Sequence, residues 1–423
     1  MKNSFIKSVT ILILGGFITK ALGILIKIIT TRIIGIKGIS LYMLILPTFN
    51  LLINLSALGM PIAFSKLISE NKINTKKLIF TNIPIIFLFK LLLIILTIIF
   101  SSFISNNLLH NSNTKISIIA MATVIPFTTI SSICRSYFFG KERMFPHVFS
   151  NIIENILRLL IIIIVLPKIL IYKIKYQVLF LILLNIISEV LSTIILILFL
   201  PKTITITKND FYPNKTYIKD TLKIGIPNTF SRLIVSIAYF FEPVILTQYF
   251  SNHIITDYGI LNGYVLPLIL LPSFFTIAIS QALLPVISNA FINNNLKLVW
   301  YKLNQAILLS LLVGIPTTII LVLKPKLLLS LIYHTTLGST YLKILAPVFL
   351  LQYLQAPLIT TLDAIGKSNI NLRANILSTI IRISSLLILS NLNLNIYSLI
   401  ISIILNIIIT TIYLIYKVKR QLK

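Results

Sequence analysis

The sequence predicts an all-α integral membrane protein with about twelve transmembrane helices in two lobes of six. Of its 423 residues, 57% are hydrophobic and only 11% are charged, whereas soluble domains carry roughly 25% charged residues. Apolar runs such as "LLLIILTIIF" (Leu91 to Phe100) recur along the chain, in windows of about 20 residues that can cross a bilayer as a helix. A stretch from the first half also returns in the second half.

The apolar windows define the expected spans in order. They are centred near residues 18, 52, 90, 126, 158, 189, 235, 274, 311, 351, 381 and 406. The longest polar interruption runs from Pro201 to Asp220. We therefore expect an N-terminal lobe over 1–200, a cytoplasmic inter-lobe linker over 201–219 and a C-terminal lobe over 220–423.

The internal repeat predicts how the two lobes are related. "LPTFNLLINLSALGMP" (Leu46 to Pro61) returns as "LPSFFTIAISQALLP" (Leu271 to Pro285), and "ITKALG" at residue 18 returns as "FSRLIV", 212 positions later. The pairs Gly140-Lys141 and Gly366-Lys367 lie 226 positions apart. Because six spans is an even number, both lobes should cross in the same direction, about a pseudo-twofold axis normal to the membrane.

The net charge of +28 predicts orientation and not a nucleic-acid partner, since cytoplasmic loops of membrane proteins collect Lys and Arg. With a cytoplasmic N-terminus, both termini and the even-numbered connections hold 22 basic residues, Arg135 among them. The odd-numbered connections hold nine and the spans six, which accounts for all 37. Both termini are therefore expected in the cytoplasm.

Charges inside the spans predict a cationic substrate site, because such charges are costly in hydrocarbon and need a functional or structural reason. The spans hold three more basic than acidic side chains. Lys20 and Arg232 occupy matched positions of the repeat, on polar helical stripes. We expect them to bind substrate together with three asparagines on such stripes, Asn50, Asn54 and Asn228.

Other charged residues in or near the spans have competing interpretations. Glu154 and Arg158 are spaced for an i, i+4 ion pair, so mutual neutralisation competes with a functional role. Glu242 precedes Pro243 inside a span, and a proton or cation site there competes with a counter-ion to the basic residues. Lys27 lies near a helix end, where we expect its ammonium group to reach the interface.

Four prolines are hinge candidates, because a proline within a span removes a backbone hydrogen bond and bends the helix. They begin and end the two copies of the repeated stretch: Pro47, Pro61, Pro272 and Pro285.

The sequence gives no indication of an enzyme, a metal or a cofactor. Cys134 is the single cysteine, so neither a disulfide framework nor a cysteine metal site is expected. The four histidines lack the HExxH spacing, and "AIGKS" at residue 364 carries only the end of a phosphate-binding loop motif.

Several segments in collinear order resemble the stage V sporulation protein B branch of polysaccharide transporters. They include "ITKALGILIKIITTRIIG", "LPTFNLLINLSALGMPIAFSKLISE", "RSYFFGKERMFPHVFSNIIENILR" and "YGILNGYVLPLILLPSFFTIAISQALLPVIS". This branch is grouped with lipid II flippases, O-antigen flippases and MATE-type multidrug extruders. The resemblance implies a V-shaped MATE-like transporter with alternating access in the bacterial cytoplasmic membrane, acting in peptidoglycan, polysaccharide or spore cell-wall synthesis.

The resemblance also bears on the site. The first-span arginine in the family's "SRVLGF" pattern matches Lys20, which keeps the charge and loses the bidentate fork. The next family arginine of that helix falls on Ile26, and the basic pair of the second helix falls among Asn50 to Asn54. The full lipid II site is therefore not carried over.

Two functions remain as alternatives. The first is a flippase for an undecaprenyl-pyrophosphate-linked saccharide, either lipid II or a related cell-wall precursor. The second is an ion-coupled MATE-type exporter of cationic drugs, which would need carboxylates in its cavity. The excess of fixed positive charge favours the anionic substrate. We expect a lipid-linked oligosaccharide and membrane lipids as partners, a monomer, no cofactor, and either Na⁺ or H⁺ as a coupling ion.

Overall fold

The computed structural model describes residues 2–70, 74–201, 212–250 and 253–422, and within these ranges it contains helices and no strand. The chain packs into two compact units, Met1–Ile237 (unit 1) and Ala238–Lys423 (unit 2). The all-α membrane fold class predicted from the sequence is confirmed.

Unit 1 contains the helices of the first half of the chain and the start of a long helix that continues into unit 2. They are α1 (Lys2–Ala57), α2 (Met60–Ser69), α3 (Thr75–Phe103), η1 (Ile104–Leu108), η2 (Ser112–Thr114), α4 (Lys115–Gly140), α5 (Met144–Ile169), α6 (Ile174–Leu198) and α7 (Lys215–Phe250).

Unit 2 contains the end of α7 and the helices that follow it. They are α8 (His253–Ile260), η4 (Leu261–Val265), α9 (Leu266–Ile269), α10 (Ser273–Ile292), α11 (Leu296–Leu323), α12 (Pro325–Tyr333), α13 (Ser339–Ala364), α14 (Ser368–Ser390) and α15 (Ile396–Gln421).

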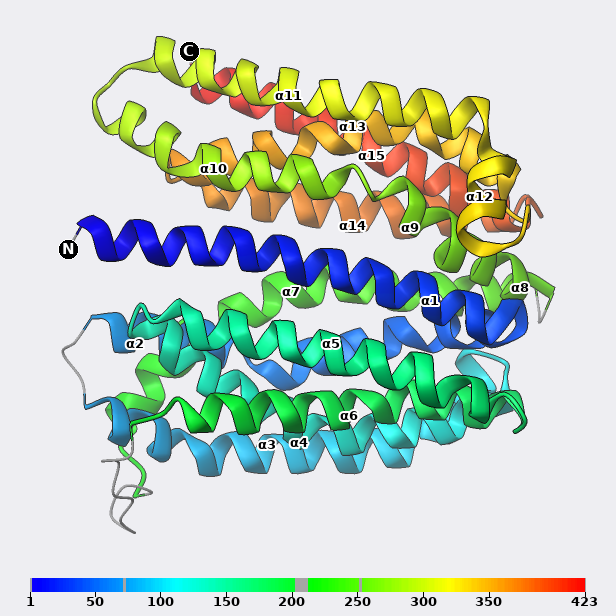
Figure 1. Cartoon of the computed structure of the whole chain (residues 1–423), viewed down its shortest axis with the longest axis horizontal. Helices are drawn as coiled ribbons and strands as arrows, with labels where there is room; N and C mark the ends of the chain where they lie inside the picture. The colour runs from blue at the N-terminus through cyan, green and yellow to red at the C-terminus, as the bar shows by residue number, and fades with distance from the viewer. Residues whose placement is uncertain (1, 71–73, 202–211, 251–252, 423) are drawn as a thin grey trace. The chain divides into compact units, whose positions relative to one another are not determined.

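The number of membrane passes follows from helix lengths and one kink. Ten segments of the described residues are long and apolar enough to cross a membrane. The first contains two passes, because α1 turns at Gly35 (φ 68°, ψ −176°), and α2 lies at the same end of unit 1 as the N-terminus (Figure 1). Helix α5, which is not among the ten, has 26 residues, enough for about 39 Å. The described residues therefore provide the twelve expected passes.

The predicted linker is only partly described. Residues 202–211 of the expected 201–219 segment lie outside the described residues. The last part is helical, because the Asn214 side chain accepts hydrogen bonds from the backbone N–H groups of Thr216 and Tyr217 (3.0 and 3.3 Å) and so starts α7. The boundary between the two compact units falls later, within α7. The predicted lobe boundaries and the axis between the lobes stay predictions.

The same packing scheme occurs inside each unit. In unit 1, α4 packs against α2, α3 and α6, and α5 packs against α6. In unit 2, α13 packs against α10, α11 and α15, and α14 packs against α15. The sequence repeat is therefore accompanied by a repeat of helix neighbours within each unit.

The turns that follow α4 and α13 fix the register of the repeat. The Arg143 N–H donates to the Phe138 carbonyl (2.9 Å), and the Lys367 N–H donates to the Leu362 carbonyl (2.8 Å). The residue before each donor is left-handed: Glu142 with φ 55° and Gly366 with φ 74°. These two Schellman turns are 224 positions apart. The Gly-Lys pairs noted in the sequence are therefore out of register by two residues.

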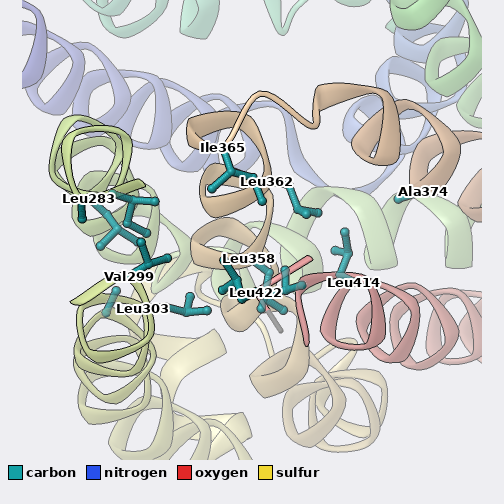
Figure 2. Close-up of a cluster of buried hydrophobic side chains, with 13 residues drawn as sticks. Leu283, Val299, Leu303, Leu358, Leu362, Ile365, Ala374, Leu414 and Leu422 are labelled. Atoms are coloured by element: carbon teal, nitrogen blue, oxygen red, sulfur yellow. The ribbon is translucent and has the colours of Figure 1, made fainter. Parts of the chain in front are cut away.

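Buried apolar side chains hold each unit together. In unit 1, Met60, Phe64 and Ile68 of α2 pack with Leu78 and Ile86 of α3. In unit 2, a larger cluster joins α10, α11, α13, α14 and α15, with Val299, Leu362 and Leu414 at or below 1% exposure (Figure 2). Since lipid is as apolar as these side chains, their contribution comes from close packing.

Candidate functional site

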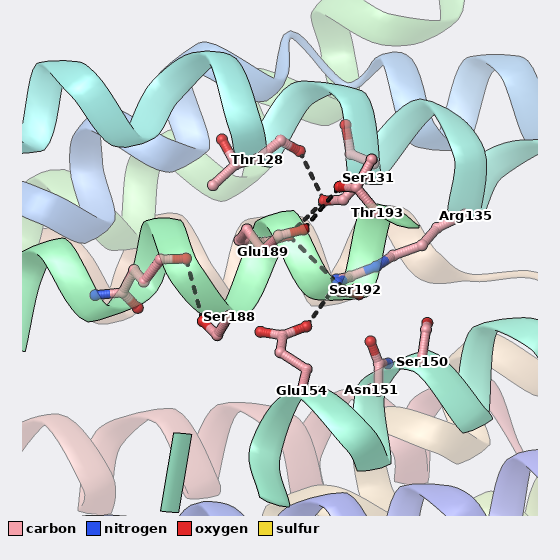
Figure 3. Close-up of polar contacts among 12 residues, drawn as sticks. Thr128, Ser131, Arg135, Ser150, Asn151, Glu154, Ser188, Glu189, Ser192 and Thr193 are labelled. Atoms are coloured by element: carbon pink, nitrogen blue, oxygen red, sulfur yellow. Dashed lines mark hydrogen bonds and ion pairs between the residues drawn. The ribbon is translucent and has the colours of Figure 1, made fainter. Parts of the chain in front are cut away.

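A partly buried network of charges connects α4, α5 and α6 in unit 1 (Figure 3). Arg135 Nη2 lies 2.8 Å from Glu154 Oε2 and 3.4 Å from Glu189 Oε2. Arg158 Nη2 donates to the other oxygen of Glu154, Oε1, at 3.1 Å. Ser131 Oγ donates to Glu189 Oε2 at 2.5 Å. Two arginines and two glutamates therefore form a cluster without net charge.

Serines on α6 complete this network. Ser188 accepts from Arg158 at 2.7 Å and Ser192 accepts from Arg135 at 2.8 Å. The residues 188 and 192 are one helical turn apart, which places both hydroxyls on the face that meets the arginines. The network is thus a polar interface among three helices, of the kind that stabilises helix association in lipid.

Sequence reasoning found part of this network and missed the rest. The i, i+4 spacing predicted an ion pair between Glu154 and Arg158, and these two side chains are paired in the structure. Arg135, however, lies five residues inside the end of α4 and not in the cytoplasmic connection to which the charge count assigned it. The available signal was Ser131 at i−4 from Arg135, a polar stripe in an otherwise apolar helix.

Among its described residues, unit 2 contains one buried ion pair. Arg382 on α14 donates from Nε to Glu242 Oε1 on α7, and Glu242 is only 1% exposed. The Arg382 guanidinium also lies 5.1 Å from the centre of the Tyr239 ring, in cation–π range. The Glu242 carboxylate is therefore already bound by a cation of its own unit.

The predicted substrate residues all belong to unit 1. Lys20 on α1, Asn50 on α1 and Arg232 on α7 are exposed. Among the described residues neither basic side chain has a hydrogen-bonding or ionic partner. Asn54 donates to Ser236 of α7 at 2.7 Å, and Asn228 donates to the backbone carbonyl of Ile224 at 2.8 Å. The hydrogen bond from Asn54 to Ser236 thus connects the polar face of the second half of α1 with the polar face of α7.

This joining depends on two glycines. Gly59 follows α1 with φ 58°, and a Cβ there would lie 2.1 Å from the backbone oxygen of Gly225. A Cβ on Gly225 would in turn lie 2.6 Å from the carbonyl oxygen of Leu58. Only glycine permits this close approach of the two backbones. Gly59 and Gly225 therefore determine how closely α7, which contains Asn228 and Arg232, packs against the end of α1.

The four hinge-candidate prolines differ in whether they lie at a helix break or inside a continuous helix. Pro61 lies in the first turn of α2, directly after the break at Gly59, and Pro272 is the N-cap of α10. Pro47 and Pro285 lie inside α1 and α10, which continue through them. Two of the hinge candidates therefore coincide with helix breaks.

Three further lysines lie in or near the expected spans. Among the described residues Lys27, Lys90 and Lys343 have no hydrogen-bonding or ionic partner, like Lys20 and Arg232. Each of the three glutamates of the spans, by contrast, is bound by at least one arginine: Glu154, Glu189 and Glu242.

No group of three His, Cys, Asp or Glu side chains suited to a metal ion occurs among the described residues. Cys134, partly buried in α4, is a free thiol.

Comparison with known proteins gives a consistent result. The family model described as polysaccharide biosynthesis protein matches residues 5–291, and the MatE model matches residues 227–388. The stage V sporulation protein B of Bacillus subtilis (strain 168) is 29% identical over 407 residues, which cover 92% of this chain and 78% of that protein. The sporulation protein YkvU of the same organism is 24% identical over 401 residues, covering 92% and 89%.

A solved structure shares the fold. It is described as the inward-facing conformation of a multidrug resistance MATE family transporter of the MOP superfamily. It matches with a TM-score of 0.77 at 16% identity, over 96% of this chain and 94% of that chain. At this identity the similarity shows the fold alone, which is that of a MATE-like multi-pass membrane protein.

Proposed function

Because the chain belongs to the polysaccharide biosynthesis protein family, we propose that it is a flippase for an undecaprenyl-pyrophosphate-linked saccharide. The substrate would be lipid II or a related cell-wall precursor, moved by alternating access from the inner to the outer leaflet of a bacterial cytoplasmic membrane. In this proposal both termini are cytoplasmic, the partner is the lipid-linked saccharide, and no cofactor takes part.

The unequal pairing of charges carries the proposal. All three glutamates within the spans are bound by arginines of their own units. Lys20 and Arg232 remain unpaired among the described residues, and buried or membrane-embedded charges without partners are costly. A polyanionic substrate would compensate them, whereas a cationic drug would find no free carboxylate among these three residues.

Lys20 and Arg232 are the side chains that we assign to the pyrophosphate. Both are exposed and unpaired among the described residues, and they hold matched positions of the repeat. Lys and Arg both bind phosphate oxygens through charge-assisted hydrogen bonds. Asn50, Asn54 and Asn228 would supply neutral contacts beside them, for the saccharide or the phosphate.

The direction of transport is consistent with the membrane potential. An inside-negative potential favours outward movement of an anion by roughly 2.3 kcal/mol per charge per 100 mV. A pyrophosphate with about two charges would gain about 4–5 kcal/mol by the same relation. This term would supplement any Na⁺ or H⁺ gradient.

The second candidate is an ion-coupled multidrug exporter, which the MATE-like fold supports. In that case Glu242 would have to exchange Arg382 for a proton or a cation during the transport cycle. The pairing of this carboxylate in the structure favours the flippase.

The test is a leaflet-accessibility assay for lipid II in cells depleted of their own flippases and complemented with variants. Lys20→Arg should retain flipping because the charge is kept, while Lys20→Gln and Arg232→Gln should each lose most of it at normal abundance. Their double variant should be little worse than either, since groups that act on one ligand are not additive. Lys343→Gln, an exposed lysine of a span in unit 2, is the control and should flip normally.

Normal flipping by both Gln variants would refute the assignment of these two residues. Export of cationic dyes by the Gln variants, with no flipping by the wild type, would instead establish the drug exporter.

A further inference from the structure

A cavity of about 170 Å³ lies inside unit 1, between the two halves of α1 and the helices α5 and α6. Its lining is mostly apolar, with Ile39 and Ile162 at or below 2% exposure. Three side chains bring hydrogen-bond donors to it: Lys27, Tyr42 and Arg158. This cavity is separate from the exposed side chains that we assign to the substrate.

The position of Lys27 adds to the interpretation of the sequence. Its position near the end of the expected first span suggests a side chain that extends to the membrane interface. The structure shows that Lys27 lines this cavity. It lies eight residues before the Gly35 turn, which corresponds to about 12 Å along the helix. Lys27 is partly buried and contributes to the wall of the cavity.

The other polar side chains of the wall, Thr30 and Asn185, already use their donor groups in hydrogen bonds to the backbone, so they have no donor free for a ligand. Thr30 donates to the carbonyl of Ile26 at 2.7 Å. The Asn185 amide donates to the carbonyls of Leu181 and Ile182 at 3.0 and 3.1 Å. The ammonium of Lys27, the hydroxyl of Tyr42 and the Nε of Arg158 are without acceptors among the described residues, and Nε is fully occluded.

No carboxylate of the described residues compensates this charge. Both oxygens of Glu154 are occupied, one by Arg135 and the other by Arg158. Glu189 faces Arg135 and Ser131. Because the two arginines and the two glutamates cancel, the charge of Lys27 is left in excess next to the cavity.

The internal repeat shows that the cavity lacks a carboxylate that unit 2 has. In the first and seventh spans, equivalent residues are 212 positions apart, so Lys27 corresponds to Tyr239 and Thr30 corresponds to Glu242. At the Schellman turns the offset is 224 positions, so Arg158 corresponds to Arg382. In unit 2 the arginine is bound by the carboxylate of Glu242. In unit 1 the corresponding position holds a threonine, and a lysine replaces the tyrosine.

We propose that this cavity binds a small inorganic anion, of phosphate size or smaller, which takes the place that the Glu242 carboxylate occupies in unit 2. A water molecule occupies about 30 Å³ of the liquid, so the volume admits such an anion with a few waters. Lys27 and Tyr42 are the donors, and the guanidinium of Arg158 adds positive charge to the wall. This inference does not depend on the proposed substrate.

The experiment measures thermal unfolding of the purified full-length protein in detergent, with chloride or phosphate against gluconate at equal ionic strength and pH. A ligand that binds only the folded state lowers the unfolding equilibrium constant by the factor 1 + [L]/Kd, about 100-fold at 100 Kd. The wild type should show a saturable stabilisation by chloride, phosphate or both. Lys27→Arg should keep it, and Lys27→Met should lose it.

Two further variants make the result specific. Thr30→Glu installs a carboxylate at the position equivalent to Glu242, so it should abolish the anion response and raise the stability in gluconate. Lys37→Met, which removes an exposed lysine from the same helix, should respond like the wild type. The double variant Lys20→Gln/Arg232→Gln should also respond, which separates this cavity from the substrate residues.

The absence of saturable stabilisation in the wild type would overturn the proposal and identify a water-filled cavity. An undiminished response in Lys27→Met would overturn it as well. If Lys27→Met does not accumulate, an anion response that persists in Thr30→Glu refutes the proposal.

Discussion

Replacing Arg382 by methionine should strongly destabilise unit 2, because Glu242 would remain buried without a partner. The Glu242 residue is 1% exposed, and removing one partner of a buried ion pair costs about 3–5 kcal/mol. For a unit of about this size, 1 kcal/mol shifts the melting temperature by about 2–4 °C. The expected decrease is therefore about 6–20 °C.

The compensating variant isolates the cause. In Glu242→Gln/Arg382→Met both charges are absent, and replacing a buried pair by neutral groups is often close to neutral in stability. The double variant should recover most of the lost melting temperature. Arg382→Lys keeps the charge but loses the planar group that lies over Tyr239, so it should fall between the wild type and Arg382→Met.

The chain offers a natural probe for this measurement. Trp300 is the single tryptophan of the sequence, and its indole N–H donates to the Leu422 carbonyl at 3.3 Å within unit 2. Its fluorescence on heating in detergent therefore reports on unfolding of this unit. An Arg382→Met protein that melts with the wild type, or a double variant no more stable than Arg382→Met, would refute the reasoning.

Two other predictions concern backbone packing and orientation. Gly59→Ala should sharply reduce the amount of folded protein in the membrane, because the new Cβ would approach the facing backbone oxygen to 2.1 Å at a positive φ; Gly23→Ala, where no atom lies within 4 Å, should accumulate normally, and equal amounts of both would contradict this packing. In a chain whose Cys134 has been replaced, cysteines at Lys141 and Lys367 should react with a membrane-impermeant maleimide only from the cytoplasm. Labelling from outside intact cells would reverse the proposed orientation.

The sequence alone determined the fold class and the repeat. Apolar windows of bilayer length depend only on local composition, so the passes could be predicted before any packing was known. The i, i+4 spacing also determined that Glu154 and Arg158 meet, because neighbours on one helix are fixed by helical geometry. The turn at Gly35 was less visible, since both sides of it are helical and the same residue types continue through it.

Only the tertiary structure decided which helices face each other and so which charges are neutralised. Glu242 and Arg382 are 140 residues apart in the chain, and Arg135 reaches carboxylates on two other helices. Helical periodicity assigns a residue to a face but does not say what that face meets. For this reason Lys27 could be expected at the interface, while packing of α1 against α5 and α6 places it in the wall of a cavity. The cost of an unpaired charge in lipid then determines which side chains are left to bind a ligand.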